Sequence, residues 1–134
     1  ETETVVLKSG VRYQEFREGK GDLVVEPGRR VACQMTARLP ALATDKETGG
    51  KQFYNTKNTD IQEIGFVIGQ GQVVPGLEEG MMGMKKGALR RIFVPDAYFA
   101  QAGELNRRGM EPQPNVKDGE RYFNGVVNNA RRDQ

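Results

Sequence analysis

Few residues of this chain could carry out covalent or metal chemistry. The sequence contains no histidine and a single cysteine, Cys33. Without histidine, Ser-His-Asp catalysis, Cys-His catalysis and a His-ligated zinc site are all excluded, and a single cysteine cannot form an internal disulfide. Cys33 lies in a run of alternating apolar residues, which favours a buried structural thiol over a reactive one.

The carboxylates and glycines do not form a recognisable cofactor motif. Aspartate and glutamate could bind magnesium or calcium, but the sequence has no Asp/Asn-rich calcium loop. Gly69-Gln70-Gly71 lacks the later glycine of a dinucleotide-binding loop, and no Gly-Lys-Ser/Thr sequence follows it. We therefore expect neither a metal nor a cofactor.

The charge of the chain is nearly balanced. It has 20 basic and 18 acidic residues, a net charge of +2, which is too small to predict nucleic-acid binding. Solvated faces and a frayed tail are the favoured interpretation of its paired basic residues, and an anionic partner is the alternative. These pairs include Lys85-Lys86, Arg90-Arg91, Arg107-Arg108 and Arg131-Arg132.

The length of 134 residues indicates one ordinary domain. A hydrophobic content of 37% permits a core with little apolar surplus. No stretch reaches the roughly 18 apolar residues that a transmembrane helix requires. The chain begins at Glu1 with neither a start methionine nor an apolar leader, so we expect this end to be processed or trimmed.

Six segments are predicted to be strands from their apolar content and alternation. Within the second of them, Val31, Cys33, Met35 and Ala37 share one face. Turns are expected at residues 18–22 and 26–28, loops at 43–51 and 100–118, and a polar lead-in at 1–9. The strand candidates are residues 11–17, 30–38, 52–54, 64–68, 89–95 and 121–127.

One helix is predicted, over residues 75–84. Pro75 suits its first turn, and Glu78 and Glu79 complement the positive end of the helix dipole. Leu77, Met81 and Met84 follow helical spacing and would face a sheet, and Gly87 would end the helix. Four strands, a helix and two further strands indicate an α+β fold in which an antiparallel sheet packs on one helix.

Several motifs then occur in an order and at a spacing that resemble FKBP domains. They are Phe66-Val67-Ile68-Gly69, Val73-Val74-Pro75-Gly76-Leu77-Glu78-Glu79-Gly80, Met84-Lys85-Lys86-Gly87 and Arg90-Arg91-Ile92-Phe93-Val94-Pro95. The resemblance covers about residues 8–127, which implies a lead-in at 1–9, an FKBP-like domain at 10–128 and a polar tail at 129–134. The chain is most similar to the chloroplast thylakoid-lumen branch of the family, because it has Leu77 in place of the usual tryptophan and because of its sequence at residues 84–91.

The resemblance implies a half-barrel antiparallel sheet wrapped around one short helix, with an apolar, aromatic-lined cleft. Among the residues that match the cleft of the family, Val73 and Val74 are the pair over which a proline ring lies, and the Val74 backbone N–H would bind a substrate carbonyl. The matching set is Phe53, Phe66, Val73, Val74 and Phe123. These residues would also be apolar in an inactive copy of the domain, because they close the core.

Five positions of the same cleft depart from the family pattern. Tyr54 stands where the family places a carboxylate, Leu77 replaces the tryptophan floor, and Phe99 takes the approximate place of a tyrosine that holds the substrate backbone. Met35 stands at the position of a wall tyrosine, and Ile64 replaces another aromatic residue. Together these five changes predict a weakened or lost catalytic site.

Prolyl isomerisation has chemical requirements that this composition does not exclude. The barrier of about 18–20 kcal/mol arises because the amide must lose its resonance. A twisted imide has less charge separation than a planar one, so a dry apolar cradle favours the transition state without a nucleophile, a metal or a general base.

The resemblance leaves two main hypotheses for function. The first is a non-catalytic accessory or assembly subunit that binds protein partners, including a photosynthetic membrane complex contacted from its soluble side. In this hypothesis the long loops 39–51 and 100–118 make the contacts with the partner. The second is an active prolyl isomerase and folding helper that acts on proline-containing chains. An unrelated small-ligand binder is a third interpretation. By resemblance, the expected location is the thylakoid lumen, without a transmembrane segment or a nucleic-acid partner.

Overall fold

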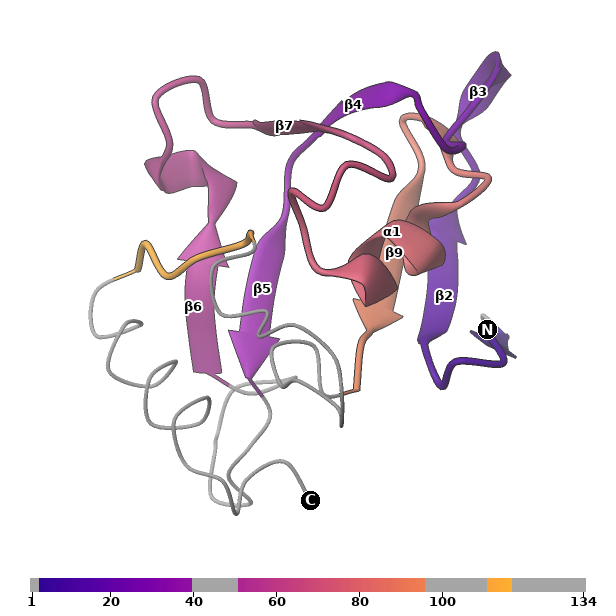
Figure 1. Ribbon diagram of the computed structural model, residues 1–134, viewed down its shortest axis with the longest axis horizontal. Helices are drawn as coiled ribbons and strands as arrows, with labels where there is room; N and C mark the ends of the chain where they lie inside the picture. The colour runs from indigo at the N-terminus through magenta and orange to yellow at the C-terminus, as the bar shows by residue number, and fades with distance from the viewer. Residues whose placement is uncertain (1–2, 40–50, 96–110, 117–134) are drawn as a thin grey trace. The chain divides into compact units, whose positions relative to one another are not determined.

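The computed structural model describes residues 3–39, 51–95 and 111–116 (Figure 1). The chain divides into two compact units, each described by itself below. The first comprises Glu1–Val31 and Phe66–Ala97, and the second comprises Ala32–Gly65 and Tyr98–Gln134.

A three-stranded antiparallel sheet forms the centre of the first unit. It consists of β1 (Thr4–Val6), β2 (Arg12–Arg17) and β9 (Leu89–Phe93), in the order β1-β2-β9. Arg12 lies opposite Phe93 and Tyr13 opposite Ile92, and the register shifts between Glu15 and Arg17. Successive side chains of a strand point to opposite faces, so this register places Tyr13 and Ile92 on one face and Arg12 and Phe93 on the other.

Two further short strand pairs are present. β3 (Lys20–Val24) pairs with β8 (Lys85–Lys86), and β4 (Arg30–Cys33) pairs with β7 (Ile64–Val67). The turn before β3 requires glycine at position 19, where φ is +79°. A Cβ atom there would lie 2.9 Å from backbone atoms of residues 85, 86 and 88, which is closer than a side chain can approach.

The helix α1 (Pro75–Met81) covers one face of the β2–β9 pair (Figure 1). Proline is its first residue, where a missing N–H costs no hydrogen bond. Gly76 and Gly80 allow close approach, because a Cβ atom at Gly76 would clash with Val94 and one at Gly80 with Ile92. A helix of seven residues is marginal alone, so its stability comes from this packing.

The second unit is built on the antiparallel pair β5 (Thr36–Leu39) and β6 (Lys51–Asn55), with a register shift between Ala37 and Arg38. A 3₁₀-helix, η1 (Thr56–Asn58), follows β6 directly. Its N-cap is Asn55, whose side chain accepts a hydrogen bond from the Lys57 amide at 2.9 Å. The cap ends the strand and starts the turn within one residue.

The structure confirms several predicted elements. The α+β class with antiparallel strands is confirmed, and one α-helix lies among the described residues. The strands predicted at 11–17, 52–54, 64–68 and 89–95 correspond to β2, β6, β7 and β9, and the turn at 26–28 is present. The loop at 43–51 (except Lys51, in β6), most of the loop at 100–118 and the strand at 121–127 lie outside the described residues.

Two N-terminal predictions were wrong. Residues 20–22, predicted as the end of a turn, belong to β3, which pairs with Lys85 and Lys86, and residues 4–6 of the supposed lead-in form β1 against β2. Both strands depend on distant partners that local composition does not reveal.

Two further boundaries differ from the prediction. The run 30–38 is interrupted at Met35, because the Met35 amide donates to Thr56 Oγ1 at 3.1 Å and its carbonyl accepts from the Thr56 amide at 3.0 Å. The helix ends at Met81, before Met84, because Gly83 takes a left-handed φ of +85° and its amide donates to the carbonyl of Val25. Gly83, not Gly87, is therefore the glycine that ends the helix.

The described helices contain no segment that is long and apolar enough to cross a membrane.

Candidate functional site

In the first unit, four of the predicted cleft residues lie at and before the helix N-terminus, and all four are buried. Phe66 is on β7, Val73 and Val74 precede α1, and Leu77 lies inside it. Val73 and Phe66 are 0% and 2% exposed. Burial of such side chains contributes about 1.5–3 kcal/mol each, so these residues are part of the core as well as candidates for a site.

The loop that carries Val73 and Val74 is anchored by two polar side chains. The Gly69 amide donates to Glu78 Oε2 at 2.8 Å, and the Val67 amide donates to Gln72 Oε1 at 2.8 Å. Glu78 is 9% exposed, so its bond to Gly69 is largely shielded from water. The loop between β7 and α1 is therefore fastened at both ends, which fixes where the two valines lie.

Val74 is the N-cap of α1, and it is followed by proline. Its carbonyl accepts a hydrogen bond from the Leu77 amide at 3.0 Å. The amide of an N-cap residue has no acceptor within its own helix, so the helix ladder does not use the Val74 N–H. This backbone donor beside two buried valines is of the kind that can hold a substrate carbonyl while an apolar ring lies on the valine side chains.

In the second unit, the remaining described candidates gather around β6. Phe53 and Tyr54 are 2% and 4% exposed, Ile64 is buried, and Met35 is half-buried. Ala37 lies opposite Tyr54 and Arg38 opposite Gln52, so Phe53 is the extra residue of a bulge in β6, and strand alternation does not separate the two buried side chains. Tyr54, being buried, fills core space, as an apolar residue would.

The segment 111–116 is fastened to β6 by Asn115. Its amide donates to the Phe53 carbonyl at 2.8 Å, and its side chain accepts from the Asn55 amide at 2.8 Å and donates to the Asn55 carbonyl at 3.0 Å. The side-chain amide thus takes the place of a backbone partner. Asn58 adds a hydrogen bond to the Asn115 carbonyl at 3.0 Å. The backbone on either side of Tyr54 is held by this one residue.

Two acidic side chains of the second unit are kept neutral. Burial, and then the nearby Glu63 carboxylate, raise the pKa of the Cys33 thiol from 9.0 to about 11. Burial, then the Glu111 carboxylate and then Cys33, raise the pKa of Tyr54 above its usual value of 10.0. Neither group supplies a charge near neutral pH. Cys33 is half-buried, and its raised pKa favours the structural thiol over the reactive one.

The predicted site residues thus fall into two groups, one in each unit. Phe66, Val73, Val74 and Leu77 belong to the first, while Met35, Phe53, Tyr54 and Ile64 belong to the second. Phe99 and Phe123 lie outside the described residues.

Sequence reasoning missed the polar anchors. Glu78 was interpreted only as a complement to the helix dipole, and neither Gln72 nor Asn115 was singled out. A carboxylate four residues into a short helix, within reach of the preceding glycine loop, was the one available signal for Glu78.

In residues 3–39, 51–95 and 111–116, no group of histidine, cysteine or acidic side chains could hold a metal ion. The described candidates therefore offer apolar surface and backbone donors, not acid–base or metal chemistry.

Comparison with known proteins agrees with this kind of site. The family model described as FKBP-type peptidyl-prolyl cis-trans isomerase matches residues 21–115. The Arabidopsis thaliana peptidyl-prolyl cis-trans isomerase FKBP19, chloroplastic, is 31% identical over 128 residues, which cover 91% of this chain and 47% of that protein. FKBP17-1, chloroplastic, of the same plant is 30% identical over 128 residues, which cover 91% of this chain and 51% of that protein.

A shorter relative is matched over most of its length. The Arabidopsis peptidyl-prolyl cis-trans isomerase FKBP12 is 31% identical over 103 residues, which cover 77% of this chain and 87% of that protein. The chain spans about half the length of the chloroplastic relatives.

Proposed function

Because the chain belongs to the family of FKBP-type peptidyl-prolyl cis-trans isomerases, we propose that it binds proline-containing segments of proteins at an apolar site and acts mainly as an accessory or assembly subunit, with little or no catalysis. The family assignment confirms the resemblance noted over residues 66–95. The proposed loss of catalysis rests on residues that differ from the family pattern.

Tyr54 is the observation that supports this proposal. The family resemblance places a carboxylate at this position, whereas this chain has a phenol that is 4% exposed. Burial and the Glu111 carboxylate raise its pKa, so the phenol stays neutral. A neutral, buried ring fills space and cannot supply the charge of a carboxylate to a bound peptide. Leu77 in the first unit and Ile64 in the second are both buried and stand where the resemblance places aromatic residues.

A second candidate function, active isomerisation, is favoured by a different observation. Phe66, Val73 and Val74 are buried, and the loop before α1 is anchored through Glu78. An apolar cradle with a backbone donor is the main requirement for lowering the barrier to rotation about a prolyl bond. Loss of one polar group would then reduce the rate without abolishing it.

A prolyl exchange assay with a parallel binding measurement separates the two candidates. The purified chain at high concentration is tested for accelerated cis–trans exchange of short Xaa-Pro peptides, and binding of the same peptides is followed by NMR line shifts. Binding without acceleration supports the accessory role. Clear acceleration supports the isomerase instead, and a folded chain that neither binds nor accelerates contradicts both.

A double variant tests why catalysis is weak. Tyr54→Asp with Leu77→Trp restores the family residues at two positions, and we expect the exchange rate to rise. Leu77 is buried, and overpacking of a core costs about 1–3 kcal/mol, so the single variants and a urea midpoint are needed as controls. A folded double variant with no gain in rate would show that these departures do not explain the low activity.

For location and partners, we propose the chloroplast and, within it, the thylakoid lumen, with a photosynthetic membrane complex contacted from its soluble side. The support is the naming of three relatives as chloroplastic and the similarity of Leu77 and the phrase 84–91 to the lumen branch. Immunodetection in separated stroma, lumen and membrane fractions tests this proposal. Recovery in the stroma alone would contradict the lumen assignment.

A further inference from the structure

The sheet β1-β2-β9 has two faces with different chemistry. On the face covered by α1, Val11, Ile92 and Val94 approach the helix at Gly76 and Gly80. Side chains at alternate positions, and their cross-strand partners, belong to the opposite face. The helix therefore covers only one side of this sheet.

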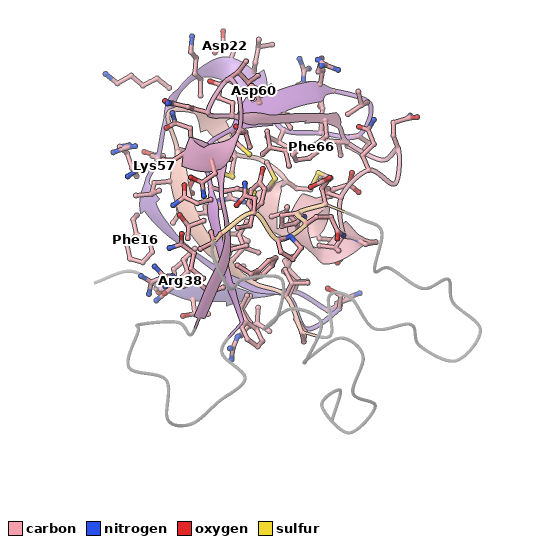
Figure 2. The ribbon with its side chains drawn as sticks, turned by 90° about the vertical axis from the view of Figure 1, so that its left-hand side faces the viewer. Phe16, Asp22, Arg38, Lys57, Asp60 and Phe66 are labelled. Carbon is pink, nitrogen blue, oxygen red and sulfur yellow. The ribbon has the colours of Figure 1, made fainter. Side chains whose placement is uncertain are left out.

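The opposite face carries exposed apolar side chains and arginines. The register places Val6 opposite Arg12 and Arg12 opposite Phe93, and strand alternation adds Leu89 and Arg91. Phe16, the extra residue at the register shift, joins them because the Arg91 guanidinium lies over its ring. Val6 is 66% exposed, Leu89 49%, Phe16 48% and Phe93 40%. Figure 2 shows Phe16 extending beyond the ribbon of β2. We call these six residues the outer sheet face.

Two guanidinium groups lie over aromatic rings on this face. The Arg12 guanidinium lies 4.2 Å from the centroid of the Phe93 ring, and the Arg91 guanidinium lies 5.4 Å from that of Phe16. Stacking restricts the long arginine side chains, so less conformational freedom is lost when their N–H edges bind an acceptor. Each pair therefore presents hydrogen-bond donors beside an apolar ring.

Arg90 points to the other side of the same strand, where several partners surround its guanidinium group. It stacks on Tyr13 at 4.1 Å, donates to the carbonyls of Gly80 and Met82 at 2.8 and 2.9 Å, and lies 3.4 Å from Glu15. By contrast, the side chains of Arg12 and Arg91 make neither a hydrogen bond nor an ion pair within the part of the chain that the structure describes. Their charge is unmatched on the outer sheet face, which contains no carboxylate.

From this charge pattern, we propose that the outer sheet face binds an acidic segment of a partner protein, in which carboxylates alternate with apolar side chains. Each carboxylate accepts two parallel hydrogen bonds from the planar fork of an arginine. The apolar side chains of the segment cover Val6, Leu89 and the ring edges of Phe16 and Phe93. Binding of such a segment excludes water from the arginine–carboxylate contacts and from the apolar contacts together. None of the proposed cleft residues takes part in it.

Other anionic partners fit the face less well. Attraction to an acidic lipid surface generally takes a cluster of about 4–8 lysines and arginines. Among the described residues, this side of the sheet carries Arg12, Arg91 and, opposite Leu89, Arg17, which donates to the Gly87 carbonyl. Single-stranded nucleic acid is bound by stacking bases on free aromatic rings, but the rings of Phe16 and Phe93 are already stacked on by guanidinium groups. A protein segment with spaced carboxylates needs neither a larger charge nor a free ring.

An NMR titration of the full chain with three matched peptides tests the proposal. One alternates glutamate with leucine and phenylalanine, a second replaces each glutamate by lysine, and a third replaces the apolar residues by glycine. We expect only the first to shift the amide signals of β1, β2 and β9, with the largest shifts near Arg12 and Arg91. Equal shifts with the lysine peptide, or shifts confined to other strands, would overturn the proposal.

Two double variants give the matched comparison. Arg12→Gln with Arg91→Gln should weaken binding of the acidic peptide about tenfold, since exposed ion pairs contribute modestly each. Lys85→Gln with Lys86→Gln removes the same charge from exposed lysines on β8, outside the face, and should change affinity less than about twofold. Equal losses in the two double variants would show that only net charge matters and would refute a specific site.

Two further measurements guard against misinterpretation. Arg12→Lys with Arg91→Lys keeps the charge and removes the planar fork, so an intermediate affinity is expected, and this variant is the less disruptive one if the glutamine variant unfolds. Vesicles with and without acidic lipid are tested in parallel. Binding to acidic vesicles that depends on the same arginines, without binding of the acidic peptide, would assign the face to a membrane surface and reject our proposal.

Discussion

The carboxylate of Glu78 should stabilise the chain far more than its neighbour Glu79 does. Glu78 is 9% exposed and accepts the Gly69 N–H at 2.8 Å, whereas Glu79 is exposed on the same helix. Loss of a hydrogen bond to a charged group costs about 1.5–3 kcal/mol, and loss of an acidic residue from the first helical turn adds about 0.5 kcal/mol. The higher helix propensity of alanine returns a few tenths of a kcal/mol.

Glu78→Ala is therefore expected to lower the free energy of unfolding by about 2–3 kcal/mol. Glu78→Gln keeps an oxygen acceptor for the Gly69 amide and should cost only about 1 kcal/mol. Glu79→Ala is the matched control, and we expect a change below about 0.5 kcal/mol. Urea unfolding measures all three, and the slope with denaturant should stay constant so that the midpoints report stability alone.

Hydrogen exchange at Gly69 gives a local measurement of the same bond. If Glu78 anchors the loop, the Gly69 amide should exchange about thirtyfold faster or more in Glu78→Ala, which corresponds to about 2 kcal/mol of lost protection. The reasoning would be refuted by a Glu78→Ala variant no less stable than Glu79→Ala. Unchanged exchange at Gly69 would refute the anchoring role even if global stability fell.

The remaining predictions concern the packing of α1 at Gly80, the hydrogen bonds of Asn115 and the thiol of Cys33. Gly80→Ala should destabilise the chain by about 1–2 kcal/mol despite a gain in helix propensity, because the new methyl group meets the stiff side chain of Ile92. Adding Ile92→Ala should then cost less than the sum of the two single changes. Asn115→Asp keeps the acceptor for the Asn55 amide but loses the donor to its carbonyl, and should cost about 1–3 kcal/mol. Cys33, with its pKa raised to about 11, should be alkylated at pH 8 about a hundredfold more slowly than an unperturbed cysteine. The unfolded chain releases the thiol proton near pH 9.0 while the folded chain keeps it, so this part of the stability should decline as pH rises from 9.0 to about 11.

Urea midpoints, double-variant cycles and mass spectrometry of alkylated protein measure these effects. A Gly80→Ala variant more stable than the parent would contradict the packing account. For the Asn115 variant, Asn58→Ala is the control, because it removes one exposed hydrogen bond and should cost less than about 1 kcal/mol. For the thiol, the urea-unfolded chain should react at the ordinary rate, and equally fast alkylation of the folded chain would contradict the raised pKa of Cys33.

The strand β2 was predictable because its own residues alternate and partly bury, whereas β1 and β3 were not. The residues of β1 are exposed along its whole length, and β3 begins with Lys20-Gly21-Asp22, a composition typical of turns. β1 forms because β2 is beside it, and β3 because β8 is. A pairing partner far along the chain supplied the stabilisation that local propensity lacks.

The apolar and polar parts of the candidate site differed in the same way. Phe66, Val73 and Val74 could be identified because large apolar residues in a matching motif are expected to be buried. Glu78 and Asn115 could not be identified, because the role of a polar side chain depends on which atom it hydrogen-bonds to, and the sequence does not give that partner. Those partners, Gly69 and Asn55, come from backbone positions that no hydrophobic pattern specifies.

The pairing of β2 with β9 also has a consequence for synthesis on the ribosome. More than 70 residues of chain separate the two strands, so β2 emerges well before its partner exists. At roughly 5–20 residues per second, the delay amounts to several seconds. During this interval β2, which carries Tyr13 and Phe16, can pair only with β1, and its edge toward β9 is open. Arg12 and Arg17 stand at its two ends, where charges hinder association with neighbouring nascent chains until β9 arrives.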